Sequence, residues 1–301
     1  MKTESNTGHI AAVITIIIWA STFVSTKVLL REFSPIEILL FRFTIGYLAL
    51  LLISPKKIKI TDRRHERYFA LAGLTGICMY YLLENIALTY TQASNVGVII
   101  SVAPFFTAMI SRTILKDENK LDMRFFAGFI MAMTGIMLIS FKGFDVQINA
   151  RGDLLALLAA FTWACYSVLS KKISEFGYHS IQVTRKTFGY GILFMIPAMF
   201  VSDFNLDLER FNNSVNLINI LFLGLGASAL CFVSWNYAVK VLGAVKTSIY
   251  IYLVPVITVL VSSAILNEVI TGKIITGIVL TVIGLFVSEK RFLRKAVLNY
   301  E

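Results

Sequence analysis

Ionisable side chains are rare inside the hydrophobic segments of this chain, and Glu84 is the carboxylate placed well within one. An unpaired charge at the centre of a bilayer costs about 2.5–3.5 kcal/mol on insertion scales, so Glu84 is expected to face protein or water. Because a buried carboxyl group is stable in its neutral form, Glu84 could exchange protons near neutral pH, or it could contact a cationic group. The alternative is that Glu84 lies near the outer end of its segment and reaches water among the lipid headgroups.

Two arginines, Arg42 and Arg185, occupy matching places in the two halves of the sequence. A guanidinium group stays charged, so each is expected to pair with a carboxylate, a carbonyl or an anionic group of a substrate. The two could therefore recognise a substrate carboxylate from opposite sides of the membrane. They could also extend toward the nearer interface, as long basic side chains do near the ends of membrane helices.

Aromatic side chains form the second group with possible binding chemistry. Trp19 and Trp163 match one another and lie away from the interfacial belt where tryptophan is enriched. They could line a central cavity and stack on a planar or cationic substrate, or pack as core between helices. Other aromatic residues gather around three segments, and we include Tyr81 and Tyr250 among the cavity candidates.

Matching amides and prolines complete the candidate set. Asn85 and Asn236 could line the cavity, or join helices through hydrogen bonds inside the lipid. Pro104 and Pro255 each remove a backbone donor in mid-segment and free a carbonyl one turn earlier. Each proline is a candidate hinge, although proline kinks are also common in membrane helices.

The elements that position these residues are membrane-spanning helices. Hydrophobic residues make up 57% of the 301 residues and charged residues 15%, a composition that excludes a soluble domain with a polar surface. A span needs roughly 17–25 apolar residues. We predict ten spans, at 9–30, 35–53, 68–89, 95–115, 125–141, 153–170, 180–201, 215–239, 245–266 and 273–288. All should be helical, because lipid cannot satisfy an open strand edge.

The two halves of the chain are copies of one another. Matched residues recur in order at offsets between 143 and 151: Trp19 with Trp163, Arg42 with Arg185, Asn85 with Asn236, Pro104 with Pro255, Gly128 with Gly277 and Gly135 with Gly284. Each half holds five spans, an odd number, so the second half must be inverted in the bilayer relative to the first. The predicted fold is an all-α bundle of two inverted five-helix repeats, at residues 1–145 and 150–301.

The net charge of +10 is distributed unevenly over the loops. If the N-terminus is inside, the inner segments carry 18 Lys and Arg and the outer segments carry five. The positive-inside rule then places both termini in the cytoplasm of a multi-pass protein of the cytoplasmic membrane. The basic residues are concentrated in particular loops and do not form one face of a soluble domain. We therefore expect the lipid bilayer, and no nucleic acid, as a partner.

The chain resembles the drug/metabolite transporter superfamily, in particular its EamA-like members. The resemblance rests on Trp19, on the run from Ala87-Leu88-Thr89-Tyr90 to Pro104, and on the run from Gly243-Ala244 through Leu253-Val254-Pro255 and Asn267-Glu268 to Gly277. It covers nearly the whole chain. It implies ten helices in two repeats with a central cavity between them, and export of amino acids, related metabolites or toxic compounds.

We therefore predict a secondary transporter, a monomer or homodimer, that moves a small organic metabolite outward by alternating access. A flippase of a lipid-linked intermediate is the alternative, and a membrane-embedded enzyme is a weaker one because the predicted spans hold no cluster of acids or histidines. No cofactor or metal site is expected, since Cys78, Cys165 and Cys231 have no metal-binding spacing and the chain lacks a nucleotide-binding loop.

Overall fold

The structure is a computed structural model that describes residues 2–91, 93–115, 123–140, 149–202, 204–257, 260 and 271–298. Within these residues the regular structure is helical, with no strand. Six helical stretches there are long and apolar enough to cross a membrane: Ser5–Leu29, Pro35–Ile53, Arg64–Tyr90, Asn95–Ile114, Ala150–Ser174 and Ser214–Leu242. Three shorter apolar helices cover Met123–Ile139, Ala244–Ile257 and Gly272–Ser288.

The first half of the chain forms the helices α1 (Lys2–Leu29), α2 (Pro35–Ile53), α3 (Arg64–Ala72), η1 (Gly73–Met79), α4 (Tyr80–Tyr90), α5 (Ala93–Ile100), α6 (Ala103–Ile114) and α7 (Met123–Ser140). The segments α3, η1 and α4 are one continuous rod, in which η1 is a stretch of π-helix. At the start of α2 the Glu37 carboxylate accepts a hydrogen bond from the backbone N–H of Ser34 at 2.7 Å, which satisfies one free donor at the helix N-terminus.

The second half forms α8 (Ala150–Ser174), α9 (Ser180–Val201), η2 (Glu209–Asn212), α10 (Ser214–Leu221), η3 (Phe222–Leu230), α11 (Cys231–Leu242), α12 (Ala244–Ser248), η4 (Ile249–Tyr252) and α14 (Gly272–Leu298). Here α10, η3 and α11 make the rod that corresponds to α3, η1 and α4, and the π-helix recurs in its middle. The predicted ninth span extends to Leu266 and the Asn267-Glu268 pair follows it, so both reach outside the described residues.

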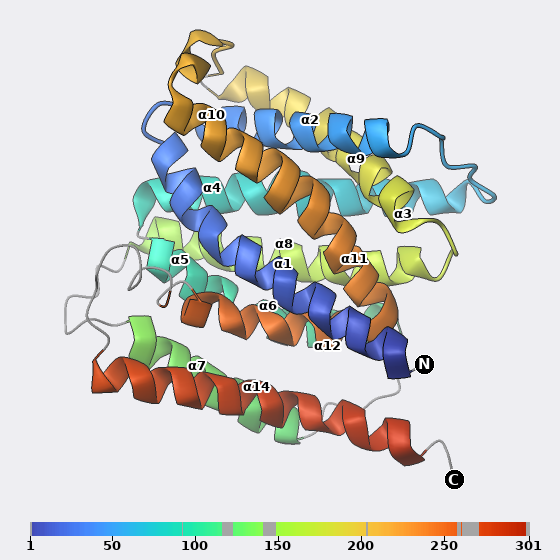
Figure 1. Ribbon diagram of the computed structural model, residues 1–301, viewed down its shortest axis with the longest axis vertical. Helices are drawn as coiled ribbons and strands as arrows, with labels where there is room; N and C mark the ends of the chain where they lie inside the picture. The colour runs from blue at the N-terminus through green and yellow to red at the C-terminus, as the bar shows by residue number, and fades with distance from the viewer. Residues whose placement is uncertain are drawn as a thin grey trace.

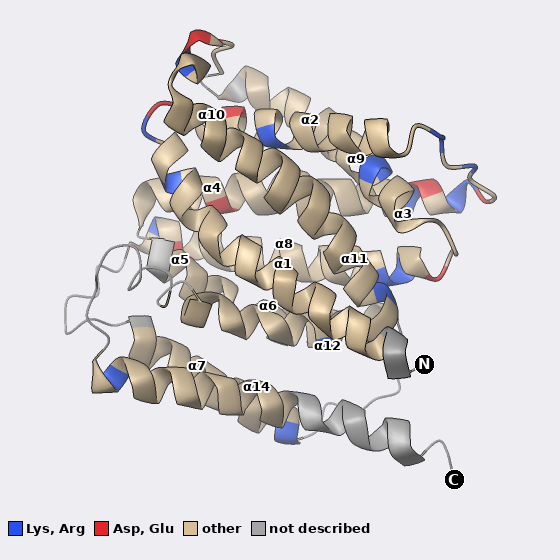
Figure 2. Cartoon of the chain, viewed as in Figure 1, with Lys and Arg blue, Asp and Glu red and all other residues tan. Residues whose placement is uncertain are grey.

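The helices run across the bundle from one end to the other (Figure 1). One end is where α1 begins and α14 ends, and it also carries loops 54–63 and 175–179; we call it the terminal face. The other end carries loops 30–34 and 202–213, and we call it the distal face. Basic residues gather at the terminal face, around the start of α3, the loop before it and the end of α8 (Figure 2).

The contacts between helices are reciprocal between the two halves. The first helix of each half packs against the third helix of the other half, as α1 with α11 and α8 with α4. The second helix of each half packs against the opposite π-helix, as α2 with η3 and α9 with η1. The predicted fold class, an all-α membrane bundle of two inverted five-helix repeats, is confirmed.

The fifth helices of the two halves, α7 and α14, approach through glycines. A Cβ atom added to Gly284 would lie 2.5 Å from the backbone nitrogen of Ala132, and one added to Gly135 would lie 2.5 Å from the Gly277 carbonyl oxygen. The pairs Gly128–Gly284 and Gly135–Gly277 therefore face one another across antiparallel helices. Without a hydrophobic driving force between helices in lipid, such close backbone contact is a main source of association.

The spans that contain Pro104 and Pro255 are both interrupted just before the proline. The α5 helix ends at Ile100 and α6 begins at Ala103, so that a turn at 101–102 precedes Pro104. In the second half the 3₁₀ helix η4 precedes Pro255 at the equivalent place. Since proline has no backbone N–H, neither residue can donate to the carbonyl four residues earlier.

We predict that Gly284→Ala destabilises the protein. The added methyl group meets backbone atoms of α7 that cannot move alone, and overpacking of this kind typically costs about 1–3 kcal/mol. Thermal unfolding of the purified protein in detergent measures the effect. Gly226→Ala is the control, because its Cβ would lie 3.6 Å from the Phe222 side chain. Equal unfolding temperatures for the two variants would contradict the role assigned to this contact.

Candidate functional site

All three tryptophans of the chain meet at one place in the middle of the bundle. The ring centroid of Trp19 on α1 lies 5.1 Å from those of Trp163 on α8 and Trp235 on α11, and the latter two are 5.8 Å apart. Tyr80 packs 4.8 Å from Trp163 and 4.6 Å from Tyr81. We considered that Trp19 and Trp163 line a cavity or pack between helices. In the structure they do both, since the two rings contact one another and also line a cavity.

The cavity beside these rings is small. Its walls come from α1, α4, α5, α8 and the η4 region, and they consist of Ile16, Trp19, Thr22, Phe23, Tyr80, Tyr81, Glu84, Ile100, Trp163, Ile251 and Val254. Its volume of about 30 Å³ matches roughly one water molecule. Pockets for small molecules usually measure about 300–1,000 Å³. The structure therefore has the central cavity closed around its aromatic walls.

Glu84 is the charged side chain on the cavity wall. It is 4% exposed, and its Oε2 atom has no hydrogen-bond partner among the described residues. The polar groups that act on its carboxyl group are Arg42 and Tyr80. The structure thus places the Glu84 side chain inside the bundle.

Arg42 lies one layer behind the wall. It is 1% exposed, its Nε atom donates to the Ser228 hydroxyl at 3.0 Å, and its guanidinium group sits 4.3 Å from the centre of the Tyr81 ring. Its Nη2 atom has no partner within the described part of the chain, and no ion pair with Glu84 is formed there. Two buried opposite charges therefore face the same ring cluster without neutralising one another directly.

Two indole N–H groups near the cavity also lack partners. Trp19 donates to the Ala227 carbonyl oxygen at 2.9 Å, whereas the Nε1 atoms of Trp163 and Trp235 are buried and find no acceptor among the described residues. Leaving a buried donor unsatisfied costs about 1–3 kcal/mol. A polar ligand or a water molecule near the cavity could supply the hydrogen bonds that these donors and the carboxylate oxygen lack.

The two interrupted helical spans border the same cavity. Ile100 and Ile251, the residues four before Pro104 and Pro255, both lie on its wall. The carbonyls that the prolines cannot bond therefore belong to residues beside the candidate site. This is the arrangement in which irregular backbone is tolerated at membrane depth, where it lines a cavity.

Several predicted candidates lie away from the cavity. Asn236 accepts from the Tyr166 hydroxyl at 2.9 Å and donates to Thr184 at 3.0 Å, so it joins α11 to α8 and α9. Asn85 donates to the Pro35 carbonyl oxygen at 3.3 Å, which links α4 to α2.

The two remaining candidates are near the terminal face. Arg185 donates to the carbonyl oxygens of Ser54 and Lys56 in the loop after α2. Tyr250 contacts His9, near the start of α1, through its hydroxyl group.

Sequence reasoning missed some of the wall. Ile16 and Phe23 lie one turn on either side of Trp19, on the same helical face, and all three line the cavity. This spacing of three and four residues was the signal that could have identified them. Val254, which immediately precedes Pro255, also lines the cavity.

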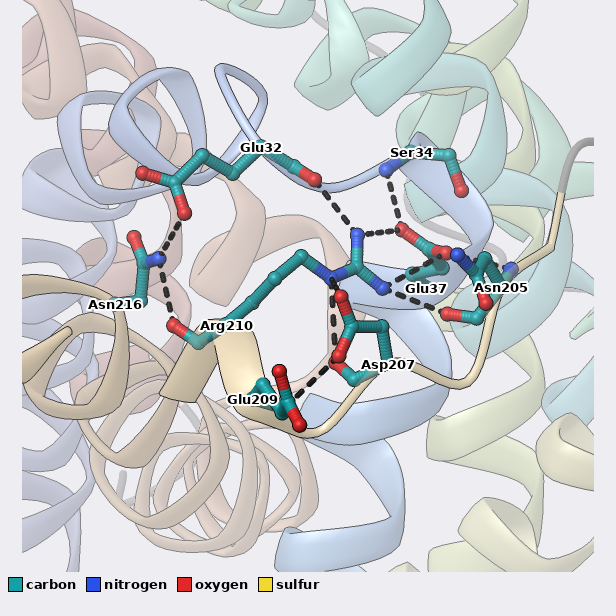
Figure 3. A network of polar contacts seen from close by, with 8 residues as sticks. All are labelled: Glu32, Ser34, Glu37, Asn205, Asp207, Glu209, Arg210 and Asn216. Carbon is teal, nitrogen blue, oxygen red and sulfur yellow. Dashed lines mark hydrogen bonds and ion pairs between the residues drawn. The ribbon is translucent and has the colours of Figure 1, made fainter. Parts of the chain in front are cut away.

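At the distal face an ionic network ties the two halves together (Figure 3). Arg210, in the loop after α9, bonds both carboxylate oxygens of Glu37 at the start of α2, at 3.0 and 3.2 Å. Arg210 also donates to the carbonyl oxygens of Glu32 and Asn205. Since the Glu37 side chain is 2% exposed, this distal clasp is a buried, charge-assisted closure.

At the terminal face the closure is aromatic. His65 stacks on Phe176 with centroids 3.6 Å apart, and the Tyr178 hydroxyl contacts His65 Nδ1 at 2.9 Å. This terminal clasp joins loop 54–63 and the start of α3 to loop 175–179. At the beginning of α1, Thr7 bonds the Tyr237 hydroxyl at 2.8 Å. Each end of the bundle therefore has contacts between the two halves, and these differ in chemistry.

We predict that Arg210→Gln opens access to the cavity from the distal face. The change leaves the Glu37 carboxylate buried without its cation, and breaking such a pair costs about 3–5 kcal/mol. The reporter is Thr22→Cys on the cavity wall, in a background with Cys78, Cys165 and Cys231 replaced by Ala. Labelling by a membrane-impermeant thiol reagent should become roughly tenfold faster, a shift of about 1.4 kcal/mol.

Arg31→Gln is the matched control for this experiment, because Arg31 is an exposed arginine in loop 30–34 at the same face. If labelling speeds up equally in both variants, or in neither, the distal clasp does not hold the cavity closed.

Comparison with known sequences places this bundle in a family. The EamA-like transporter family model matches the chain twice, at residues 6–141 and at residues 150–289. The similarity continues into individual proteins. A protein of Archaeoglobus fulgidus called an uncharacterized transporter is 27% identical over 256 residues, which cover 83% of this chain and 86% of that protein.

Two further proteins illustrate the range of relatives. The uncharacterized transporter YdfC of Bacillus subtilis is 28% identical over 250 residues, covering 81% of this chain and 78% of its own length. A protein of Streptantibioticus cattleyicolor called a probable terminal-alkyne amino-acid exporter is 25% identical over 253 residues, covering 84% and 83%.

A solved crystal structure shares the fold, with a TM-score of 0.72 at 17% sequence identity, covering 93% of this chain and 97% of the other. The family model accounts for most of both halves of the sequence, and the relatives that match along its length are named as transporters rather than enzymes. The helical bundle with its closed central cavity is therefore that of a membrane transporter, and this chain belongs to the EamA-like transporter family.

Proposed function

We propose that this transporter is a secondary exporter of a small metabolite with an ammonium group, and that an amino acid is its substrate. The observation that carries the proposal is the position of Glu84, a buried carboxylate with one unpaired oxygen on a wall whose other side chains, apart from Thr22, are aromatic or aliphatic. A carboxylate in such surroundings favours a cationic group over a neutral one.

The aromatic wall supports the same class of ligand. Trp19 and Trp163 line the cavity beside Glu84, and cations bind over the faces of tryptophan more strongly than over other rings. Arg42, behind Tyr81, has an unpaired Nη2 donor that could meet a substrate carboxylate once the ring moves. A zwitterionic substrate would then pair with both residues, its ammonium group with Glu84 and its carboxylate with Arg42.

The rest of the wall favours an apolar side chain on the substrate. Ile16, Ile100, Ile251 and Val254 offer hydrocarbon surface rather than hydrogen-bonding groups. The name of one relative, a probable terminal-alkyne amino-acid exporter, combines these two properties, an amino acid and a hydrocarbon end. We therefore favour amino acids with hydrocarbon side chains.

For transport, the closed cavity must open alternately to the two faces. We propose that the repeats, at residues 1–145 and 150–301, rock about the interrupted spans at Pro104 and Pro255, and that the distal and terminal clasps release in turn. The terminal face, where basic residues gather around the start of α3, the loop before it and the end of α8, is the cytoplasmic face in this proposal (Figure 2). Both termini then lie in the cytoplasm.

The test is uptake into proteoliposomes that contain the purified protein, with labelled amino acids and amines, with and without an imposed pH gradient. Saturable uptake of amino acids with hydrocarbon side chains is expected. Because all three tryptophans surround the site, a saturable change in tryptophan emission should accompany binding of the same compounds. Absence of both signals, with translocation of a lipid-linked intermediate instead, would favour the flippase.

We predict that Glu84→Gln lowers uptake at least roughly tenfold and removes its response to the pH gradient. Glutamine keeps the size of the side chain but can neither attract an ammonium group nor exchange a proton, and one missing charge-assisted contact is worth about 1.5–3 kcal/mol. The measurement is the initial rate of uptake at several internal and external pH values.

Glu175→Gln is the control, because Glu175 lies outside the cavity with 44% of its side chain exposed. Full, pH-dependent transport by the Glu84 variant would remove that residue from the coupling mechanism.

A further inference from the structure

A basic groove outside the central cavity lies between α2 and α9 near the terminal face. Its volume is about 330 Å³, within the usual range for small-molecule pockets and much larger than the central cavity. Three cations, Lys57, Arg185 and Lys186, line it together with tyrosines and aliphatic residues. The transport mechanism proposed above makes no use of this groove.

Arg185 gives the groove a fixed shape. The side chain is 6% exposed, and its guanidinium group donates to the carbonyl oxygens of Ser54 and Lys56. These bonds hold the chain that leaves α2 against α9. Lys57, the next residue, is thereby placed at the groove with its side chain exposed.

The groove keeps a positive charge after its internal pairing is counted. Lys186 forms an ion pair with Glu66 at 2.8 Å, and the Tyr190 hydroxyl donates to the same carboxylate. Three cations against this one carboxylate leave a net charge of +2. An anion with one or two negative charges, such as a phosphodiester, complements the groove.

Hydrocarbon surface borders the groove on the side toward the middle of the bundle. Leu193, on the groove wall, is 54% exposed, and Ile196, one turn further along α9, is 43% exposed. Gly189 leaves open space in the wall, since a Cβ atom there would meet only the Tyr47 ring, at 3.5 Å. A ligand with both an anionic head and apolar chains fits this combination better than a soluble anion.

We propose that the groove between α2 and α9 binds an anionic phospholipid, with the phosphodiester contacting Lys57 and Lys186 and an acyl chain passing over Gly189 onto the apolar surface of α9. Basic pockets between membrane helices at the headgroup level are suited to such lipids. The bound lipid would bridge the second helix of one repeat and the second helix of the other. It would therefore act on the relative position of the repeats.

Native mass spectrometry of the purified full-length protein tests the site, using dioleoyl phosphatidylglycerol, dioleoyl phosphatidylcholine and glycerol phosphate as probes. Phosphatidylglycerol should be retained over phosphatidylcholine, and glycerol phosphate should not compete at equal concentration. The double variant Lys57→Gln/Lys186→Gln should weaken phosphatidylglycerol binding by roughly tenfold or more. Retention of both lipids to the same extent by the unaltered protein would overturn the proposal.

Two further variants separate a specific site from general attraction and from misfolding. Lys59→Gln/Arg63→Gln removes the same charge from the same face, outside the groove, and should leave binding within about twofold of the unaltered protein. Gly189→Trp keeps every charge but fills the groove, and should weaken binding as much as the double lysine variant. Equal loss in the control variant, or unchanged binding in Gly189→Trp, would exclude the groove as the binding site.

Discussion

The bilayer offers no hydrogen-bond partners, and this constraint organises the whole molecule. It requires the backbone to be helical and close packing to replace the hydrophobic effect between helices. The glycine contacts between α7 and α14 meet that requirement, as do the hydrogen bonds made by the side-chain amides of Asn85 and Asn236. Against this background, the unsatisfied atoms of Glu84 and Trp163 stand out because both residues line one cavity, and Arg42 and Trp235, also unsatisfied, pack against the rings of its wall.

The backbone follows the inverted repeat more closely than the side chains do. The π-helices, the interrupted spans and the reciprocal packing all recur, whereas Glu84 corresponds to Trp235 in the second half. Arg42 and Arg185 correspond in sequence, yet the first is buried beside the aromatic cluster and the second fixes a loop at the terminal face. The duplication thus supplies a symmetric frame, and the candidate chemistry comes from the places where the two copies differ.

Much of the fold was accessible from the sequence, because apolar length and the internal duplication depend on residues close along the chain. The same reasoning placed Trp19, Trp163, Tyr81 and Glu84 as cavity candidates, and these four line the wall. It could not separate Arg42 from Arg185, since periodicity gives the face of a helix but not the neighbour it meets. The distal clasp was equally hidden, because Glu37 and Arg210 are joined only by the tertiary structure.

The two clasps differ in a way that bears on the direction of transport. A carrier with identical closures at both ends would divide its time equally between its two open forms. Here one closure is ionic and buried, and the other is built from stacked rings and hydroxyl groups. In the proposed alternating-access mechanism, the two closures can be altered separately by substitution in the loops, which would shift the bias between inward-facing and outward-facing forms and leave the proposed substrate site unchanged.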